Sequence, residues 1–331
     1  MKKIIALTLS LMFILVMVSA CGEKAPAPAP ESEPTVMRLA TLKGPTTMGL
    51  VKLLSDAEAN ALDYTVENTI YGAADEITGL LISGEIDAAA IPANLASILY
   101  NKTGGEIRVA AINTLGVLYI VENGETISSV LDLKGKTVYS TGKGTTPEYA
   151  LRSILLWNGI DPDTDLTIEY KSEATEIAAI LTAENSDAIA LLPQPYVTTV
   201  LMGNSNIRIA LNLTEEWRKA SGDELVTGVL VARKDFIEQN PEAFEAFLRD
   251  YKLSTEYVTE NPDDAAALIE RYGIVAKAAV AKAALPYCNI TYIDGDEMQT
   301  LLAKYLEALY SQNPAAVGGA IPDEQFYYTA Q

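Results

Sequence analysis

The 331-residue sequence contains no histidine, and this absence excludes several kinds of chemistry. Histidine is the commonest general base near neutral pH and a principal ligand of transition metals. Catalysis by a Ser–His–Asp or Cys–His arrangement is therefore impossible, and a zinc site would have to be built from carboxylates. We expect no bound metal and no cofactor, and the lack of histidine argues against an enzyme.

Basic side chains and cysteines are also scarce. The chain has 24 Lys and Arg residues against 44 Asp and Glu, so its formal net charge is −20 at pH 7. Nucleic-acid and anionic-membrane surfaces need clustered Lys and Arg, so this balance argues against both, although it says little about a small ligand. Of the two cysteines, Cys21 belongs to the leader described next. Cys288 then has no disulfide partner, and we interpret it as a small buried apolar residue.

The chain begins with a segment typical of a secretion signal. Lys2 and Lys3 are followed by an uncharged, mostly apolar run over residues 4–20. A retained membrane-spanning helix is the alternative, since roughly 17–25 apolar residues can cross a bilayer. The stretch VSAC, which ends at Cys21, resembles the lipobox of bacterial lipoproteins. The resemblance implies that residues 1–20 are removed as a signal peptide and that Cys21 is acylated, which gives a stable membrane anchor.

A proline-rich stretch separates this signal from the folded part. Residues 21–35 read CGEKAPAPAPESEPT, a composition that favours an extended, semi-rigid tether and cannot bury a core. We therefore expect the fold to start near Val36. About 295 residues then remain, which is enough for two lobes.

Strand-like and helix-like patterns alternate in two consecutive series, which predicts an α/β fold with mainly parallel sheets. The first series has expected strands at 36–41, 64–70, 86–91, 107–112 and 117–122, and expected helices at 48–59, 73–82 and 93–101. The second has strands within LDLKGKTVYS and at 167–170, 188–192, 207–211 and 227–232, with helices at 147–158, 173–182 and 195–202. A helical tail is expected at 242–259, 262–272, 275–284 and 296–310. This pattern predicts one lobe from 36–118 with 227–331 and a second lobe from 119–226.

The segment GKTVYSTGKGTTPEY, residues 135–149, looks like a phosphate-binding loop between a strand and a helix. A Walker-type loop needs G-x-x-x-x-G-K-[ST], but position 130 is Val, and Lys143 is followed by Gly144. We therefore reject a nucleotide-hydrolysing loop. What remains is the start of a helix, whose unpaired N–H groups attract an anion.

Two interpretations of this helix start stay open. Glu148 either contacts a ligand or caps the helix, because Thr145 and Glu148 have the spacing of a capping box. A sister loop, KGPTTMGL, has no acid in its first turn. We therefore rank residues 44–49 above 144–149 as the place where a negative or electron-rich ligand group binds.

The lipoprotein signal, the proline tether, the two βα lobes and the helical tail together resemble the solute-binding proteins of ABC importers. Within these, the chain is similar to the nitrate/taurine/alkanesulfonate and thiamine-pyrimidine-precursor group. The resemblance covers nearly all of 36–260 and is carried by the strand–turn–helix junction at 39–54, SGEIDAAAIPAN, SVLDLKGKTVYSTGKGTTPEYALRSILLWNGIDP, ENSDAIALLPQPYV and GVLVARKDFIEQNPEAFEAFL. It implies a two-lobed type II periplasmic-binding-protein fold, in which the lobes close around a ligand by hinge motion.

Ligands of open α/β sheets bind beyond the carboxyl ends of the strands, and this rule agrees with the resemblance. Together they select a set of candidate ligand-binding residues, all near expected strand ends or crossovers. The set is Thr41, Gly44, Thr46, Thr47, Tyr71, Gly72, Pro92, Asn94, Asn113, Thr114, Thr141, Gly144, Thr145, Thr146, Glu148, Tyr149, Gln194, Tyr196, Thr227 and Gly228.

The ligand chemistry stays open between two branches of the resemblance. A sulfonate would use hydroxyls and helix starts, whereas a pyrimidine would use aromatic stacking and a carboxylate. The set contains no Arg or Lys, which disfavours a multiply charged anion. We expect a monomeric importer subunit, lipid-anchored on the extracytoplasmic side, that passes a small organic solute to an ABC permease. A sensor or adhesion lipoprotein that presents ligand on the same fold is the alternative. The pyrimidine synthases related to this group are enzymes on the same fold, but they depend on histidine, and this chain has none.

Overall fold

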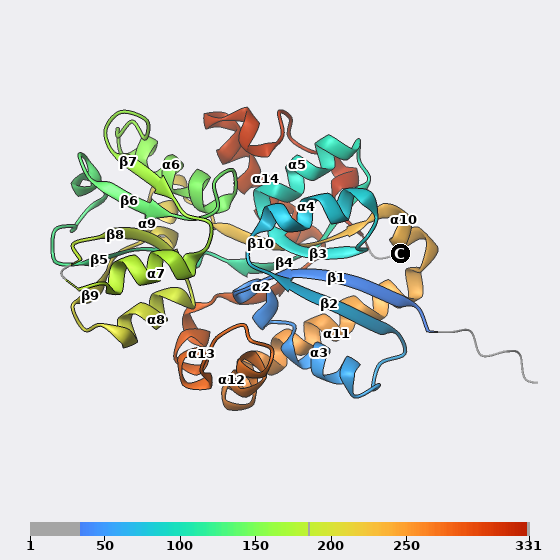
Figure 1. Cartoon of the computed structure of the whole chain (residues 1–331). Coiled ribbons are helices and arrows are strands. Elements are labelled where there is room, and N and C mark those ends of the chain that lie inside the picture. The colour runs from blue at the N-terminus through green and yellow to red at the C-terminus, as the bar shows by residue number, and fades with distance from the viewer. Residues whose placement is uncertain (1–33, 185, 330–331) are drawn as a thin grey trace, which may run out of the picture. The chain divides into compact units, whose positions relative to one another are not determined.

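Two β-sheets organise the folded chain, which a computed structural model describes for residues 34–184 and 186–329 (Figure 1). The expected signal peptide at 1–20, the acylation site Cys21 and the tether up to residue 33 lie outside the described residues. Residues from Thr35 onward form one compact unit. No helix of the described residues is long and apolar enough to cross a membrane.

Sheet A has six strands in the order β11-β4-β10-β3-β1-β2. The strand β1 pairs in parallel with β2 and β3, whereas β10 is antiparallel to β3 and β4, and β11 is antiparallel to β4. The strand β3 reads AAAIP and is almost wholly buried because it lies between β1 and β10 with helices on both faces. The strands are β1 (Val36–Leu42), β2 (Thr65–Tyr71), β3 (Ala88–Pro92), β4 (Ile107–Leu115), β10 (Val226–Arg233) and β11 (Ile290–Ile293).

Sheet B has five strands in the order β7-β6-β8-β5-β9. Here β6 is parallel to β7 and β8, while β5 is antiparallel to β8 and β9. The chain passes from β4 of sheet A to β5 of sheet B through Gly116 and returns from α9 to β10. The strands are β5 (Leu118–Asn123), β6 (Thr137–Ser140), β7 (Thr167–Tyr170), β8 (Ile189–Pro193) and β9 (Ile207–Asn212).

Helices cover both faces of each sheet, as the alternating pattern predicts (Figure 1). Around sheet A lie α2 (Pro45–Met48), α3 (Val51–Glu58), α4 (Ala74–Ser83), α5 (Ala93–Thr103), α10 (Lys234–Gln239), α11 (Pro241–Glu260), α12 (Pro262–Arg271), α13 (Ala278–Ala284) and α14 (Gly295–Gln312). Around sheet B lie α6 (Thr146–Trp157), α7 (Ala174–Thr182), α8 (Tyr196–Gly203) and α9 (Leu213–Ser221). Short 3-10 helices are η1 (Val130–Leu133), η2 (Leu285–Tyr287), η3 (Pro314–Val317) and η4 (Glu324–Phe326).

The C-terminal helix α14 packs against elements of both sheets. Its apolar face, which includes Met298, Tyr305 and Leu309, lies in the same buried cluster as β10 and α6. The ring of Tyr305 lies 5.5 Å from that of Trp217 on α9, measured between ring centroids. The helix therefore joins the two halves of the fold.

The prediction of mainly parallel sheets is wrong, because only four of the nine strand pairs of the described residues are parallel: β10 and β11 in sheet A and β5 in sheet B run antiparallel to their partners. Two predictions of single elements are also wrong in detail. The helix expected at 48–59 is divided into α2 and α3 around Gly49, whose added Cβ would lie 2.9 Å from Cγ2 of Ile290. The strand β11 was not expected, because its four residues pair with β4 only through tertiary contact.

Candidate ligand-binding site between the two sheets

Several predicted residues of sheet A meet where the carboxyl end of β4 lies beside the amino end of β10. A Cβ added to Gly228 would lie 2.6 Å from Oδ1 of Asn113 and 2.7 Å from Cγ2 of Thr46. Thr114 is also in contact, at 3.2 Å, and the Thr227 hydroxyl donates a hydrogen bond of 2.5 Å to the Leu115 carbonyl. Only glycine fits at position 228, and the structure brings these predicted residues together.

Asn113 is buried at this meeting point. Its Oδ1 accepts a hydrogen bond of 3.0 Å from the Thr114 hydroxyl, whereas its Nδ2 has no hydrogen-bond partner among the described residues. The nearby Tyr251 hydroxyl has its pKa raised by burial, and the Asn113 side chain partly offsets that rise. A buried amide N–H without a partner is costly, so the Asn113 Nδ2 is an unsatisfied donor where β4 meets β10.

The threonines of the first strand end direct their hydroxyls into the protein. Thr41 donates to Oδ1 of Asn68 at 3.3 Å, Thr46 donates to the Leu42 carbonyl at 3.1 Å, and Thr47 donates to the same carbonyl. The helix that they begin, α2, is a single four-residue turn after Gly44, with no side-chain cap and no acid. These hydroxyls can still accept hydrogen bonds from a ligand, but their protons are already used.

The Glu148 carboxylate forms a hydrogen bond with the backbone of the loop before α6. Its Oε2 accepts a hydrogen bond of 2.6 Å from the Gly144 N–H, while the Thr145 hydroxyl donates back to the Gly142 carbonyl at 2.7 Å. The reciprocal capping box is therefore incomplete, but the carboxylate does satisfy a backbone N–H of the loop. The same carboxylate and burial together raise the pKa of the neighbouring Tyr170, burial being the larger cause.

Asn94 and Thr146 join the two sheets. The Asn94 Nδ2 donates to the carbonyls of Gly144, at 3.2 Å, and Ala316, at 3.0 Å. Its Oδ1 accepts from the Thr146 hydroxyl at 3.3 Å, and that hydroxyl accepts in turn from Tyr305 at 3.0 Å. Both predicted residues are buried, so their polar groups connect α5 with α6 and α14.

Sequence reasoning missed one acidic residue that faces the first lobe. Glu173 lies just after β7, and a Cβ added to Gly72 would be 2.9 Å from its Oε1. Its Oε2 accepts a hydrogen bond of 3.2 Å from the Thr175 hydroxyl. Burial raises the pKa of Tyr196 on α8, and the charge of Glu173 raises it further. The strand-end rule would have found Glu173 if it had been applied to β7 as well.

The other predicted residues have varied surroundings. Gln194 is buried, precedes a cis bond to Pro195, and accepts from the backbone N–H and hydroxyl of Thr198 at 3.2 and 2.8 Å. The side chain of Tyr149 lines a hollow between α6 and α14. Half-buried positions at strand ends or crossovers are held by Tyr71, Pro92 and Thr141.

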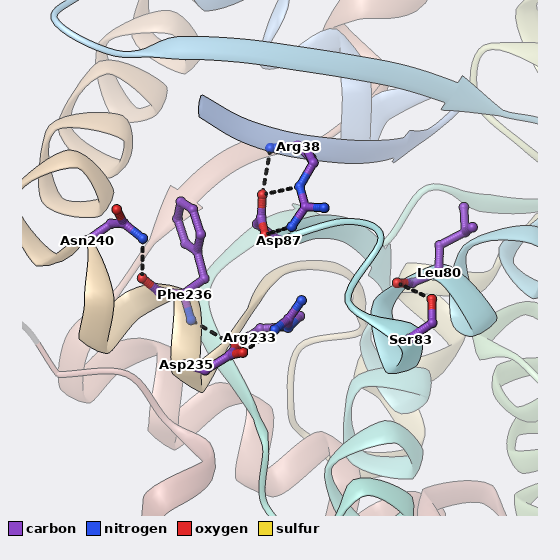
Figure 2. Close-up of polar contacts among 8 residues, drawn as sticks. All are labelled: Arg38, Leu80, Ser83, Asp87, Arg233, Asp235, Phe236 and Asn240. Carbon is purple, nitrogen blue, oxygen red and sulfur yellow. Dashed lines mark hydrogen bonds and ion pairs between the residues drawn. The ribbon is translucent and has the colours of Figure 1, made fainter. Parts of the chain in front are cut away.

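A hollow of about 310 Å³ lies at the opposite end of sheet A, near the amino ends of β1 and β3 (Figure 2). Its charges are paired: Arg38 donates to Asp87 through Nε at 2.9 Å, and Arg233 donates to Asp235 through Nε at 3.0 Å. The Asp87 side chain is only 4% exposed. None of the predicted residues lines this hollow, and its neutralised ion pairs favour a structural role.

Residues 80–265, more than half of the chain, match the family model described as NMT1/THI5 like. The chain belongs to the NMT1/THI5-like family. No curated protein sequence matches it. Among the described residues, no group of three or more Asp, Glu, Cys or His side chains is arranged to hold a metal ion.

Solved structures share the fold of this NMT1/THI5-like chain. An ABC transporter from Parabacteroides distasonis is 25% identical, with a TM-score of 0.73, over 90% of this chain and 100% of that one. The periplasmic aliphatic sulphonate binding protein SsuA from Escherichia coli is 18% identical, with a TM-score of 0.71, over 90% and 94%. The alkanesulfonate-binding protein SsuA from Xanthomonas axonopodis pv. citri, bound to MOPS, is 15% identical, with a TM-score of 0.69, over 88% and 96%.

These matches confirm two predictions from the sequence. The fold is the two-lobed α/β fold of periplasmic binding proteins, and the family is the one that the sequence segments resemble. The two matched SsuA structures that share this fold are described as binding proteins, which agrees with the expectation that the NMT1/THI5-like chain is not an enzyme.

Proposed function

We propose that this NMT1/THI5-like protein is an extracytoplasmic solute-binding protein, anchored through acylated Cys21, that delivers a small organic solute to an ABC permease. The observation that carries the proposal is the meeting of Gly72 with Glu173, because it places strand ends of sheet A against strand ends of sheet B. The binding-protein fold of the matched structures supports the same function. The protein acts as a monomer in this proposal.

Two lobes move against each other about the crossovers between the sheets. The lobes are 36–118 with 227–331, and 119–226, which carry sheet A and sheet B. At the first crossover, a Cβ added to Gly116 would collide with the Thr214 hydroxyl, so glycine is needed for the two sheets to approach there. Closure forms the bonds of Asn94 to Gly144 and Thr146, and opening breaks them.

The ligand lies between the lobes, among the predicted strand-end residues. Asn113 donates to it from sheet A through its Nδ2, which has no partner within the part of the chain that the structure describes. Glu173 accepts from it on the side of sheet B, where Tyr196 supplies an aromatic ring. Sulfonates, pyrimidines and related small molecules are the candidate ligands, and the matched SsuA proteins bind sulfonates.

The first test is a thermal-shift screen of the protein with ethanesulfonate, MOPS, 4-aminopyrimidine, riboflavin and small carboxylates, together with mass spectrometry of co-purified molecules. We expect one class to raise the melting temperature in a saturable way, without turnover of the compound. Conversion of the compound to a product would contradict a binding-protein function.

The second test compares substitutions of two acidic residues that lie close together in the sequence, Glu173 and Glu169. Glu173→Gln should weaken binding of an N–H-bearing ligand about tenfold, since a charge-assisted hydrogen bond contributes about 1.5–3 kcal/mol. Glu169→Gln is the control, because it removes the same charge from an exposed acidic residue on β7. The Glu169 carboxylate pairs with Lys171. Equal affinities for the two variants would place the ligand elsewhere.

A further inference from the structure

The first crossover between the two sheets is only two residues long. The strand β4 ends at Leu115 and β5 begins at Leu118, so that Gly116 and Val117 connect sheet A with sheet B at this place. Because a peptide group is planar, the chain can change direction here only by rotation about the φ and ψ bonds of these residues. The hydrogen bonds of the successive peptide groups therefore decide where such a rotation occurs.

The peptide groups before Val117 are held by residues of the sheet A lobe. The Leu115 N–H donates to the Asn289 carbonyl at 3.1 Å, and the Leu115 carbonyl accepts from the Thr227 hydroxyl at 2.5 Å. The Gly116 carbonyl accepts a hydrogen bond from Nδ2 of Asn289. Thr227 lies on β10 and Asn289 directly precedes β11, so both partners belong to sheet A or its immediate continuation.

The next peptide group is held by sheet B. The Val117 carbonyl accepts a hydrogen bond of 3.0 Å from the N–H of Gln194, which follows β8, and Leu118 pairs with Pro193 of β8. The change from one sheet to the other therefore falls between two successive peptide groups, and the bonds that separate these groups are φ and ψ of Val117. A hinge is a short segment whose φ and ψ absorb a domain motion, and Val117 occupies that position.

Asn289 makes its two contacts from an uncommon backbone conformation. Its φ is 42°, in the left-handed region, and Asn60 is the other non-glycine residue with a positive φ among residues 34–184 and 186–329. Asparagine enters this region more readily than most residues do. In this conformation, one residue binds two successive peptide groups of the crossover, through its carbonyl and its carboxamide. Such a backbone outlier motivates a functional role.

We propose that Asn289 is a positioning residue of the hinge: its carboxamide holds the Gly116 peptide group to sheet A, so that rotation of the sheet B lobe is confined to Val117. This inference rests on the proposed closure of the two lobes. Without the carboxamide, the Gly116 peptide group is released, and glycine has no Cβ to restrict its φ and ψ. The rotation then extends over both residues, and the lobes occupy a wider range of relative positions.

Asn289→Gly and Asn289→Asp test the proposal while keeping the left-handed backbone conformation, which glycine adopts freely and aspartate tolerates. Glycine lacks the Nδ2 donor, and aspartate places a carboxylate oxygen, which cannot donate, near the Gly116 carbonyl. Asn60→Gly is the matched control, since it makes the same change at a left-handed residue in the exposed loop between α3 and β2.

Double electron–electron resonance between two spin labels measures the range of lobe positions in the full chain. The labels are attached through Met202→Cys on α8 and Leu253→Cys on α11, two exposed positions that lie on different lobes. Cys288 is buried, so it should not react with the label, and Cys21 is replaced by serine in every variant. The melting temperature of each variant is measured alongside.

Without ligand, we expect the population outside the main distance peak to rise about two- to tenfold in both Asn289 variants, which is the factor that one net hydrogen bond supplies. Asn60→Gly should keep the distribution of the unaltered protein. A distribution of either Asn289 variant equal to that of Asn60→Gly would overturn the proposal. The proposed function is judged separately, with Asn289 intact: it fails if neither ethanesulfonate, MOPS nor another compound of the thermal-shift screen changes the distance between the labels.

Discussion

Replacing Asn94 by alanine tests whether the hydrogen bonds between the lobes contribute to ligand-induced closure. Asn94 takes part in three hydrogen bonds, and each contributes about 0.5–1.5 kcal/mol net, so that we expect the free energy of unfolding to fall by about 2–4 kcal/mol. Two of the three, to Gly144 and Thr146, cross between the sheets. Their loss should disfavour the closed form by about 1–3 kcal/mol and weaken ligand affinity by roughly 5–150-fold.

Asn101→Ala is the matched control for this experiment. Asn101 lies on the same helix and also donates to two carbonyls of the C-terminal segment, those of Val317 at 2.9 Å and Ala320 at 2.7 Å. It makes no bond to sheet B residues among those described. Urea denaturation should show a loss of stability in both variants, whereas calorimetric titration should show weaker ligand binding only in Asn94→Ala. Equal affinity in the two variants would refute a contribution of these bonds to closure.

Three further predictions concern other parts of the fold. Burial alone would raise the pKa of Glu122, but hydrogen bonds from backbone groups and the ion pair with Arg208 hold it below the usual range. This carboxylate therefore stabilises the protein above the unfolded-state pKa of about 4.3, and the stability is lost as the pH falls through the lower folded-state pKa. Glu122→Gln should flatten the acid limb of a stability–pH curve, and an unchanged limb would contradict this. Gly228→Ala should destabilise the protein by about 1–3 kcal/mol in urea denaturation, because its Cβ has no room, and an unaffected midpoint would show that the neighbours yield. Glu148→Gln should lower stability by about 1 kcal/mol and leave ligand affinity intact if Glu148 only caps α6. Glu76→Gln is the matched control and should have the same effect, because Glu76 accepts a hydrogen bond from the Ala73 N–H at 3.0 Å. A selective loss of affinity in Glu148→Gln, measured by titration, would identify Glu148 as a ligand contact instead.

The alternation of elements was predictable because strands and helices have different periods of apolar residues. The helices expected at 242–259 and 262–272 match α11 and α12 within two residues, since each has a proline start and an amphipathic face. Short segments were less predictable. The strand β11 depends on its pairing with β4, and Tyr328 reaches Val109 by a backbone hydrogen bond of 2.8 Å from the far end of the chain.

The candidate site was predictable as a set of positions but not as a set of roles. The strand-end rule predicts that these polar residues lie at one edge of each sheet, but it does not predict their hydrogen-bond partners. It could not show that the Thr47 proton is used by the Leu42 carbonyl, or that the Asn94 amide donates to Gly144 before α6 and to Ala316 of the C-terminal segment. The rule was not applied to the end of β7, where it would have selected Glu173, and only the structure shows the approach of Glu173 to Gly72.

The sequence by itself determined the α/β class, the absence of histidine chemistry and the strand ends proposed for ligand binding, because these follow from residue type and local periodicity. Tertiary structure alone decided which of those polar groups remain free. Among the described residues, the Asn113 amide N–H has no partner, while Asn94 and Thr146 use their polar groups to hold the lobes together. The difference arises because a hydrogen bond depends on distance and direction in space, and residues far apart in the chain become partners only when the two sheets pack.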